Sequence, residues 1–534
     1  MKGPVFSKLS RAARRCSTCV ARFMKSPKGR PEPLAPLPCP LPYDASGAWT
    51  TATTSAARQC VLNNLERDLK WWRKKQQTCA AGSTPDVDAT LCRVRSQGPR
   101  SVLTNMMLLR NVRGRLSAMI LLDPGDERGP MRHWPGRPVA AIQQLAAVQQ
   151  SIDEGRLRPL PENFTAILNP HDSPNQFARY DWCGHVPLLS NSRVSGENRD
   201  LMMPDFSFAP FSYLTNMIAA NLSAAMSVPR GWAEERAAIY AAGKRLPYAA
   251  KQRTLFWRGG ETHEQRRVYS TAVVEKRVAL PAQVRSDVRL CGAHCSLQEG
   301  VPPEAWCDHK QLLSLPGHSF AVGFKYTLLC SSLVVRGAHP TKCQGSKCPR
   351  VYEQFWHAGL REDEHFVSSA AVDDLGTVVT AADGLADAAL VASHSGSYAY
   401  HVLDPDFITE YWHALLSGYA GMFDWASASS PAADVCARGH RQNPTNPPER
   451  VCFRGTGGKC HFKLLGVSDD DFVPVPSLRT IAAKCNSTEG MQSLYRRFAH
   501  VVPLRMTGSM NVSVAAANAL AAWKDGSFRK APRN

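Results

Sequence analysis

The sequence lacks the patterns by which nucleotide and metal sites are most often found. Its Gly-containing loops fit neither the G-x-G-x-x-G dinucleotide fingerprint nor the Walker P-loop. Its cysteines follow no zinc-ribbon spacing, and no pair of histidines completes a ligand set. No run of about eighteen apolar residues occurs, so no transmembrane segment is predicted. These absences exclude the commonest nucleotide-binding, zinc-binding and membrane-spanning patterns.

The first 30 residues also lack the continuous apolar stretch of a secretory signal. Their longest candidate, Cys19–Met24, is interrupted by Arg22. The arm is rich in Arg and Ser and nearly free of acids, which is also typical of an organelle transit peptide. A true start elsewhere is a third alternative, so this segment leaves the compartment open.

The cysteines and glycosylation sequons favour the lumen of the endoplasmic reticulum or the Golgi. Seventeen cysteines are present, and we expect them to form disulfides rather than bind metal. An odd total leaves at least one thiol free if the others pair. Four N-x-Ser/Thr sequons support the secretory pathway. The cysteine clusters are Cys291–Cys295, Cys343–Cys348 and Cys436, Cys452 and Cys460, and the sequons begin at Asn163, Asn221, Asn486 and Asn511.

Composition indicates a globular protein with a basic surface. The 534 residues are 44% hydrophobic and 20% charged, enough for two or more domains. The formal net charge is +19, and the first 43 residues contain nine Lys/Arg against Glu32 alone. This excess suits an anionic ligand. Nucleic acid is the competing partner, but no basic stripe interleaved with aromatic residues supports it, so we expect none.

The order of predicted elements indicates an α/β fold. An amphipathic helix is predicted at Ala56–Gln77 after a Pro-rich linker, and another helix at Val139–Glu154. From Arg253 strands and helices alternate, which predicts a parallel sheet with helices on both faces. We divide the chain into an N-terminal arm and linker (1–50), a helical and mixed region (51–155), an α/β core (156–425) and a Cys-containing, disulfide-tied C-terminal appendage (426–534).

Two segments have the chemistry that a nucleoside diphosphate requires. Phe256–Arg267 (FWRGGETHEQRR) places a Gly pair and arginines after a strand, and His309–Val335 leads from a Gly-containing loop into a helix with Lys325. Glycines let backbone N–H groups approach an anion, while a helix N-terminus and cationic side chains balance its charge. Arg258 and Arg266 fit a diphosphate clamp, although a solvated helix face would also explain arginines here. For Lys325 the alternative is a lysine extending from a helix end.

Asp172 is the candidate general base. It follows the predicted strand Thr165–Leu168, and Pro170 and Pro174 stiffen its loop. An aspartate held in a stiff loop can act as a base that takes a proton from a neighbouring hydroxyl. The alternative is that Asp172 only caps a turn, as an aspartate before Ser-Pro often does.

These segments resemble the CAP10-like O-glycosyltransferases, glycosyltransferase family 90, which includes protein O-glucosyltransferases. The resemblance extends over roughly residues 163–419 and depends on several blocks in the same order. The blocks are Ala166–Pro174, Pro204–Phe211, Arg258 with Gly259 and Arg266, Phe324–Val335, Glu364–Val367 and Asp406–Ala420.

The resemblance implies a GT-B-like fold, with two Rossmann-like domains facing a cleft. It also implies an inverting transfer of a sugar, glucose or a pentose, from a UDP-sugar to a protein Ser/Thr or glycan hydroxyl. Asp172 would act as base, and no metal or other cofactor is expected. The residues implied to bind the donor are Arg258, Gly259, Arg266, Ser319, Phe324 and Lys325.

The chain departs from the family pattern at the diphosphate clamp. Gly323 stands where most members have an arginine before the Phe-Lys pair, and Arg267 where the glucosyltransferases usually have an acid. Losing one charged clamp would cost about 2–4 kcal/mol of transition-state stabilisation. Lys310 or Arg336 could compensate. The alternative is a weakened or inactive paralogue that binds sugar nucleotides or glycans.

Overall fold

The computed structural model describes residues 39–44, 46–78, 85–87, 90–91, 93–94, 103–122, 136–176, 185–194, 197–211, 230–291, 301–337, 352–369, 371–384, 387–425, 471–485 and 487–501. Several predictions fall outside these residues. They concern residues 1–38, the clustered cysteines other than Cys291, and the sequons at Asn221, Asn486 and Asn511.

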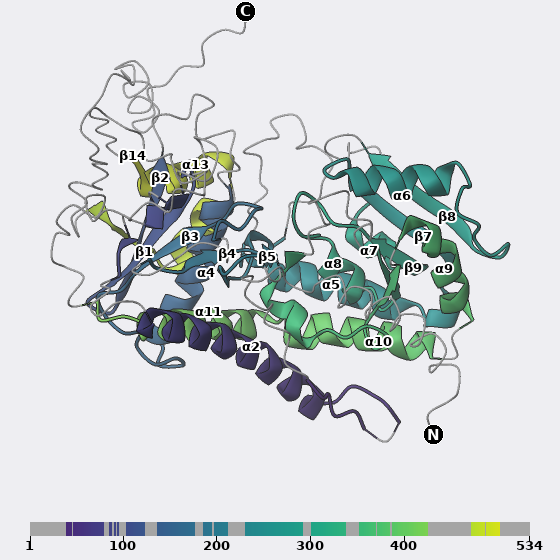
Figure 1. Cartoon of the computed structure of the whole chain (residues 1–534), viewed down its shortest axis with the longest axis horizontal. Helices are drawn as coiled ribbons and strands as arrows, with labels where there is room; N and C mark the ends of the chain where they lie inside the picture. The colour runs from purple at the N-terminus through teal and green to yellow at the C-terminus, as the bar shows by residue number, and fades with distance from the viewer. Residues whose placement is uncertain are drawn as a thin grey trace, which may run out of the picture.

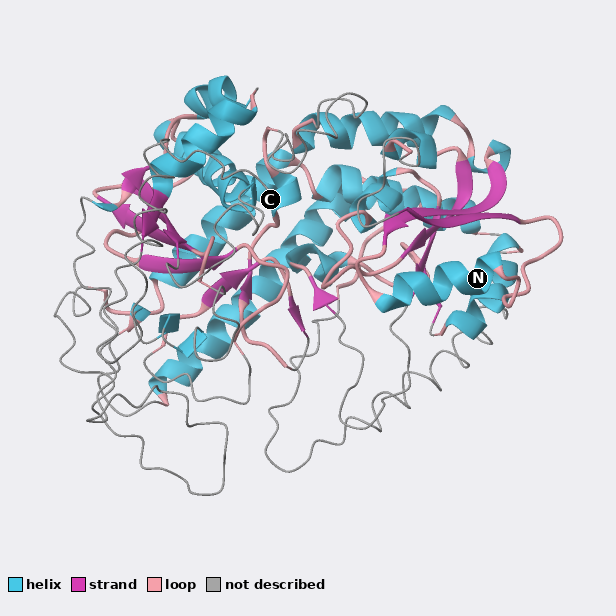
Figure 2. Cartoon of the chain, turned by 90° about the horizontal axis from the view of Figure 1, so that it is seen from above, coloured by secondary structure: helices cyan, strands magenta, loops and turns pink. Residues whose placement is uncertain are grey.

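The described residues form two lobes side by side, each built on its own sheet (Figure 1). Seen from above, the strands gather in two separate groups with helices around each (Figure 2). Helix α2 (Thr51–Gln77) lies along one side of the molecule (Figure 1). Thr50 caps the N-terminus of this helix with a capping box. Lys74 and Lys75 lie in its last turn, where their positive charges interact favourably with the helix dipole.

The first sheet is mixed. Its path is β13-β2-β1-β3-β4-β6, and β14 also pairs with β2. Strands β1 and β2 form an antiparallel hairpin whose turn residues, Arg113 and Gly114, both have positive φ, as a tight two-residue hairpin turn requires. Strands β3, β4 and β6 are parallel to one another. The strands are β1 (Met107–Val112), β2 (Arg115–Leu122), β3 (Thr165–Asn169), β4 (Leu188–Ser190), β6 (Leu201–Met202), β13 (Val473–Pro474) and β14 (Ala499–Val501).

The second sheet is fully parallel, as the alternation of strands and helices predicts. Its strand order is β12-β10-β9-β7-β8. Numbered along the chain, this is the doubly wound order 2-1-3-4-5, whose direction of winding reverses between β7 and β9. The strands are β7 (Gln252–Gly260), β8 (Arg285–Cys291), β9 (His309–Ser314), β10 (Leu333–Gly337) and β12 (Val367–Ser369). A short ribbon of β5 (Arg193–Val194) and β11 (Tyr352–Glu353) pairs segments of the two lobes.

Helices cover these sheets. The main ones are α4 (Gly136–Asp153), α5 (Trp232–Arg245), α6 (Glu264–Val274), α9 (Leu375–Asp383), α10 (Ala388–Ser397), α11 (Pro405–Ala420), α12 (Leu478–Cys485) and α13 (Thr488–Phe498). Shorter helices are η2 (Phe206–Phe208), η3 (Tyr248–Ala250), α7 (Pro303–Trp306), α8 (Phe324–Leu329), η4 (Phe355–Gly359), η5 (Val372–Asp374) and η6 (Tyr398–Val402).

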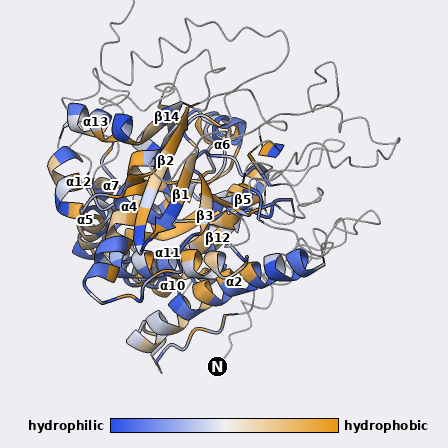
Figure 3. Ribbon diagram, turned by 90° about the vertical axis from the view of Figure 1, so that its left-hand side faces the viewer, coloured by the Kyte–Doolittle hydropathy of each residue, from blue (hydrophilic) through white to orange (hydrophobic). Residues whose placement is uncertain are grey.

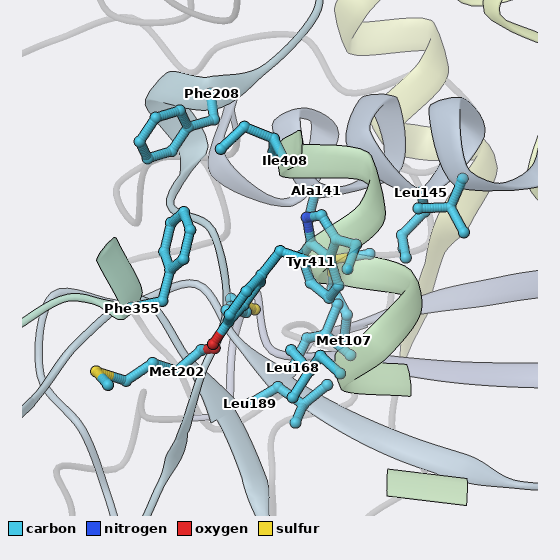
Figure 4. Close-up of a cluster of buried hydrophobic side chains, with 14 of the residues drawn as sticks. Met107, Ala141, Leu145, Leu168, Leu189, Met202, Phe208, Phe355, Ile408 and Tyr411 are labelled. Carbon is cyan, nitrogen blue, oxygen red and sulfur yellow. The ribbon is translucent and has the colours of Figure 1, made fainter. Parts of the chain in front are cut away.

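The largest hydrophobic cluster joins the first sheet to α4 and α11. Figure 4 shows Met107 and Leu168 of the strands facing Leu145 of α4 and Tyr411 of α11, and all four side chains are buried. Strands β1 and β2 are mostly hydrophobic, whereas α2 has both hydrophobic and hydrophilic surface (Figure 3). Burial of such aliphatic and aromatic side chains contributes about 1.5–3 kcal/mol each relative to exposure.

Most elements predicted from the sequence are present, but one strand was missed. The predicted helices at 56–77 and 139–154 correspond to α2 and α4, and the alternation after residue 253 is confirmed. Residues 309–314, interpreted as part of a polar loop, instead form the central strand β9. The first sheet takes strands from 51–155 and from 426–534, so it crosses the domain boundaries expected from the sequence.

Two disulfide bonds lie within the described residues. Disulfides join Cys39 to Cys60 and Cys307 to Cys330, which confirms disulfide formation. Cys485 is a buried free thiol. Among the described helices none is both long and apolar enough to cross a membrane.

Candidate functional site

A pocket of about 140 Å³ lies at the carboxyl ends of the second sheet's strands. Ser314 ends β9, Arg336 and Gly337 end β10, and Ser368 belongs to β12. In doubly wound sheets ligands bind outside the carboxyl ends of the strands, where the winding reverses. The full lining is Ser314, Pro316, Ser319, Phe320, Ala321, Phe324, Arg336, Gly337, Tyr352, His357 and Ser368.

Arg266 lies at the point where the winding reverses. Its Nε donates to Pro316 O (2.8 Å), and its Nη1 donates to Gly260 O (3.0 Å), so the guanidinium joins the loops after β7 and β9. Burial lowers the pKa of Arg266 to about 10, and no carboxylate of the described residues forms an ion pair with it. A half-buried cation without an acidic partner among the described residues is suited to bind an anion.

Two neighbouring groups extend this anion site. Thr262 Oγ1 is buried and has no hydrogen-bond partner among the described residues. Gly317 lies next to both side chains, because a Cβ there would lie 3.4 Å from Arg266 Nη2 and 3.5 Å from Thr262 Oγ1. Helix α6 begins beside them, with His263 as N-cap, so its positive dipole end adds to the local potential.

Arg258 and Gly259 have contacts within the sheet. Arg258 Nη2 pairs with Asp287 Oδ2 (2.6 Å), and its Nη1 donates to Asp287 O (2.7 Å). A Cβ on Gly259 would lie 2.4 Å from the Trp257 indole. The structure therefore gives Arg258 an acidic partner that Arg266 does not have.

Ser319 and Phe324 both line the pocket, and both are buried. Phe324 begins α8, and Arg336 lies over its ring with 5.4 Å between Cζ and the ring centroid. The sequence named Arg336 only as a substitute cation, and it did not single out His357 or Thr262. The position of Arg336 at the end of a hydrophobic strand was the available signal.

Lys325 faces the first lobe, and its residue is only 1% exposed. Its Nζ donates to Ser207 Oγ and to Val322 O (3.3 Å), and Ser207 Oγ donates to Asp205. Burial lowers the pKa of Lys325, against the opposing charges of Asp205 and Glu235. The structure thus places its ammonium in a contact between the lobes, outside the pocket lining.

Asp172 lies in the loop after β3, as predicted. Its Oδ1 is 2.9 Å from Arg137 Nη2 at the start of α4, and its carbonyl accepts from Ser192 Oγ (3.2 Å). The Asp172 side chain keeps 29% of its surface exposed, whereas Arg137 keeps 12%. The carboxylate is therefore oriented by one cation and still accessible to a second molecule.

Contacts connect the Asp172 loop to the pocket. Arg137 lies over the Phe206 ring (4.5 Å), and Phe206 packs against Phe320 of the pocket with ring centroids 6.3 Å apart. A second connection runs through Ser192 and β5 to Tyr352 of β11, which also lines the pocket. The candidate base and the anion site therefore belong to neighbouring surfaces where the lobes meet.

This combination defines an α/β protein with a pocket at the carboxyl ends of a parallel sheet, an arginine without an acidic partner among the described residues near it, and an aspartate in the neighbouring lobe. The family model described as glycosyl transferase family 90 matches residues 164–444, just over half of the chain. The chain therefore belongs to glycosyl transferase family 90 and is a transferase that requires a sugar donor and an acceptor. A comparison with curated proteins gives no match.

Proposed function

We propose that the protein is an inverting glycosyltransferase that moves a sugar from a UDP-sugar to a hydroxyl of a protein Ser/Thr or a glycan. The two sheets would then be the two domains of a GT-B-like architecture. The observation that carries the proposal is Arg266, a half-buried cation at the reversal point of a doubly wound sheet, whose described guanidinium hydrogen bonds go to carbonyl oxygens. A diphosphate would supply the negative charge that these contacts lack.

Asp172 is proposed as the general base. Arg137 engages Oδ1, and no hydrogen bond of the described residues occupies Oδ2. Oδ2 would accept the proton of the acceptor hydroxyl as that oxygen attacks the anomeric carbon. The bond from this carbon to the diphosphate oxygen breaks on the opposite side, and its electron pair leaves with UDP.

We propose that cationic side chains, rather than a metal, stabilise the leaving diphosphate. Arg266 and the N-terminus of α6 would balance the charge that develops on its oxygens. Addition of EDTA should then leave the transfer rate unchanged. A loss of activity that Mn²⁺ or Mg²⁺ restores would contradict metal independence.

We propose the lumen of the endoplasmic reticulum or Golgi as the compartment. The disulfides Cys39–Cys60 and Cys307–Cys330 support an oxidising compartment, and Asn163, whose side chain is exposed, offers an accessible sequon. Glycosidase treatment of protein from secretory cells should lower its mass, and Asn163→Gln should reduce that shift.

A donor panel tests the main proposal. Purified protein is incubated with UDP-glucose, UDP-xylose, UDP-galactose and UDP-N-acetylglucosamine, with Ser/Thr peptides or glycans as acceptors. Product from one α-linked donor should have the β configuration by NMR, and retention would contradict inversion. UDP binding without transfer or hydrolysis would favour the inactive paralogue that Gly323 suggests, and no binding of any UDP compound would refute the donor class.

A further inference from the structure

We propose that Arg336 and His357 form the second phosphate-binding arm of the pocket and replace the cation that Gly323 does not supply. The proposal rests on the proposed function, because it names side chains, in addition to Arg266, that would bind the donor diphosphate. It assigns a role to two residues that line the pocket.

Arg336 and Lys310 are the two residues that could replace the missing cation, and their positions on the strands distinguish them. Lys310 lies near the amino end of β9, and its Nζ lies over the Tyr248 ring (5.0 Å). Ser314 of the pocket is four residues further along this strand, which is about 13 Å at the usual rise. Arg336 ends the neighbouring parallel strand β10 and lines the pocket itself. Lys310 is therefore at the opposite edge of the sheet.

The guanidinium of Arg336 is held by aromatic rings rather than by a carboxylate. It lies over Phe324 (5.4 Å) and Phe366 (5.7 Å). Glu353 and Glu362 are its nearest acids electrostatically, but neither forms an ion pair with it, and burial lowers the pKa of Arg336. The rings fix the plane of the guanidinium while leaving its N–H groups available for a phosphate.

His357 adds an uncharged hydrogen-bond donor to the pocket. The backbone N–H of Gln354 donates to His357 Nδ1 (3.4 Å), so the ring proton lies on Nε2. Nε2 is buried and has no hydrogen-bond partner among the described residues. A buried donor without a partner destabilises the fold, and a ligand oxygen at Nε2 would remove that cost. Burial, followed by the charges of Arg336 and Lys325, lowers the pKa of His357 well below its usual value, so the ring stays neutral.

Contacts with the first lobe fix Gln354, whose backbone N–H sets the tautomer of His357. Gln354 Nε2 donates to Asp205 Oδ2 (2.6 Å), and Asp205 caps η2 through Ser207. The same Ser207 accepts from Lys325. Lys325 would therefore support the pocket through Asp205 and Gln354, as a positioning residue, rather than by touching a phosphate.

Gly323 and Arg336 flank the same ring. Gly323 precedes Phe324 in the chain, and Arg336 lies over Phe324 from β10. A Cβ on Gly323 would first meet the Trp306 ring at 3.9 Å, so the space beside it is open. Arg336 of strand β10 would thus supply, beside Phe324, the positive charge that Gly323 lacks.

Isothermal titration of the full chain with UDP, uridine and inorganic pyrophosphate tests the proposal. Arg336→Gln should weaken UDP and pyrophosphate binding about 10- to 100-fold and change uridine binding less than about twofold. Arg336→Lys should recover part of the loss, because it restores charge without the planar fork. Lys310→Met, which removes a cation at the opposite edge, is the matched control and should bind UDP normally. Thermal unfolding of each variant identifies any loss of fold.

The outcomes separate the two proposals. Equal UDP affinity in folded Arg336→Gln and Lys310→Met would overturn the role of Arg336. If the native chain binds pyrophosphate through Arg336 but shows no preference for UDP, the phosphate arm stands and the UDP donor is refuted. Binding of neither ligand by the native chain would overturn both.

Two substitutions of His357 test its hydrogen-bond donor separately from Arg336. His357→Gln keeps an amide N–H near the position of Nε2, whereas His357→Phe keeps the ring shape and removes the donor. UDP affinity should fall about five- to tenfold in His357→Phe and stay within twofold in His357→Gln. Equal affinities in folded His357→Phe and the native chain would remove His357 from the arm.

Discussion

Arg137 Nη2 lies 2.9 Å from Asp172 Oδ1, and the same guanidinium stacks over the Phe206 ring. The ion pair ties the loop after β3 to the start of α4, and the stacking restricts how the guanidinium can turn. Asp172 is thereby oriented from one side only. Oδ2 has no hydrogen bond among the described residues, which suits the proposed role as general base.

Replacement of the base should affect chemistry and not donor binding. Asp172→Asn is expected to lower the transfer rate at least about 100-fold, since the amide cannot take the proton. UDP affinity, measured by titration, should stay within about twofold. Asp406→Asn, at a side chain that is 91% exposed, is the control and should transfer normally. An equal loss of UDP binding in Asp172→Asn would instead indicate that the aspartate only caps a turn.

Two adjacent arginines on α6 should differ sharply. Arg266→Ala should weaken UDP binding by about 1.5–3 kcal/mol, because a buried charge-assisted contact is lost. Arg267→Ala should leave UDP affinity unchanged, since the Arg267 side chain is 59% exposed and pairs at the surface with Glu261 and Glu264. UDP should also raise the Tm of the native chain and of Arg267→Ala, but not that of Arg266→Ala. Similar affinities for the two variants would remove Arg266 from the site.

Two glycines of the candidate site should respond differently to a side chain. Gly323 has φ −67°, so its backbone does not require glycine, and Gly323→Arg should change the unfolding free energy by less than about 1 kcal/mol. Gly259→Ala should destabilise the fold by about 1–3 kcal/mol, because its Cβ would overlap the Trp257 indole. Denaturant unfolding of both variants measures this difference. Loss of the fold in Gly323→Arg would show that glycine is structurally required there.

Lys251 should make stability rise with pH. Its Nζ donates to Cys307 O (2.9 Å), Cys330 O (2.6 Å) and Ser332 Oγ (3.1 Å), and burial lowers its pKa to about 8. The native state therefore releases this proton near pH 8, while the unfolded chain keeps it to about pH 10.5. Stability relative to Lys251→Met should increase as pH rises from about 8 towards 10. A constant or falling difference in denaturant unfolding would contradict the lowered pKa.

The sequence could predict elements whose pattern is local. The spacing of Leu62, Leu65, Leu69 and Trp72 predicts α2. The last three side chains are buried in this helix, and Leu62 is half-buried. Strand β9 was missed because the segment begins with His309 and Lys310 and leads into Pro316 and Gly317, which are typical of loops. Its inner position depends on pairing with β7 and β10, which no local pattern contains.

The candidate site shows the same limit. Asp172 and Arg266 were named because strand ends and Gly pairs are visible in the sequence. The direction of Lys325 was not visible, since its partner Ser207 is 118 residues away. His357 was not named, because its role depends on a tautomer fixed by a backbone contact. Resemblance to a family identifies positions in the chain, whereas the partners of a side chain depend on the tertiary fold.

The placement of β13 and β14 against β2 has a practical consequence for protein production. A fragment trimmed to the family-matched residues 164–444 would contain β3, β4 and β6 but neither β1 and β2 nor β13 and β14. The exposed edge of β3 would then present unpaired backbone groups and the hydrophobic residues Ala166, Ile167 and Leu168 to solvent. Such a fragment should aggregate on expression. Soluble material therefore requires boundaries that keep residues 103–122 and 471–501 with the catalytic region.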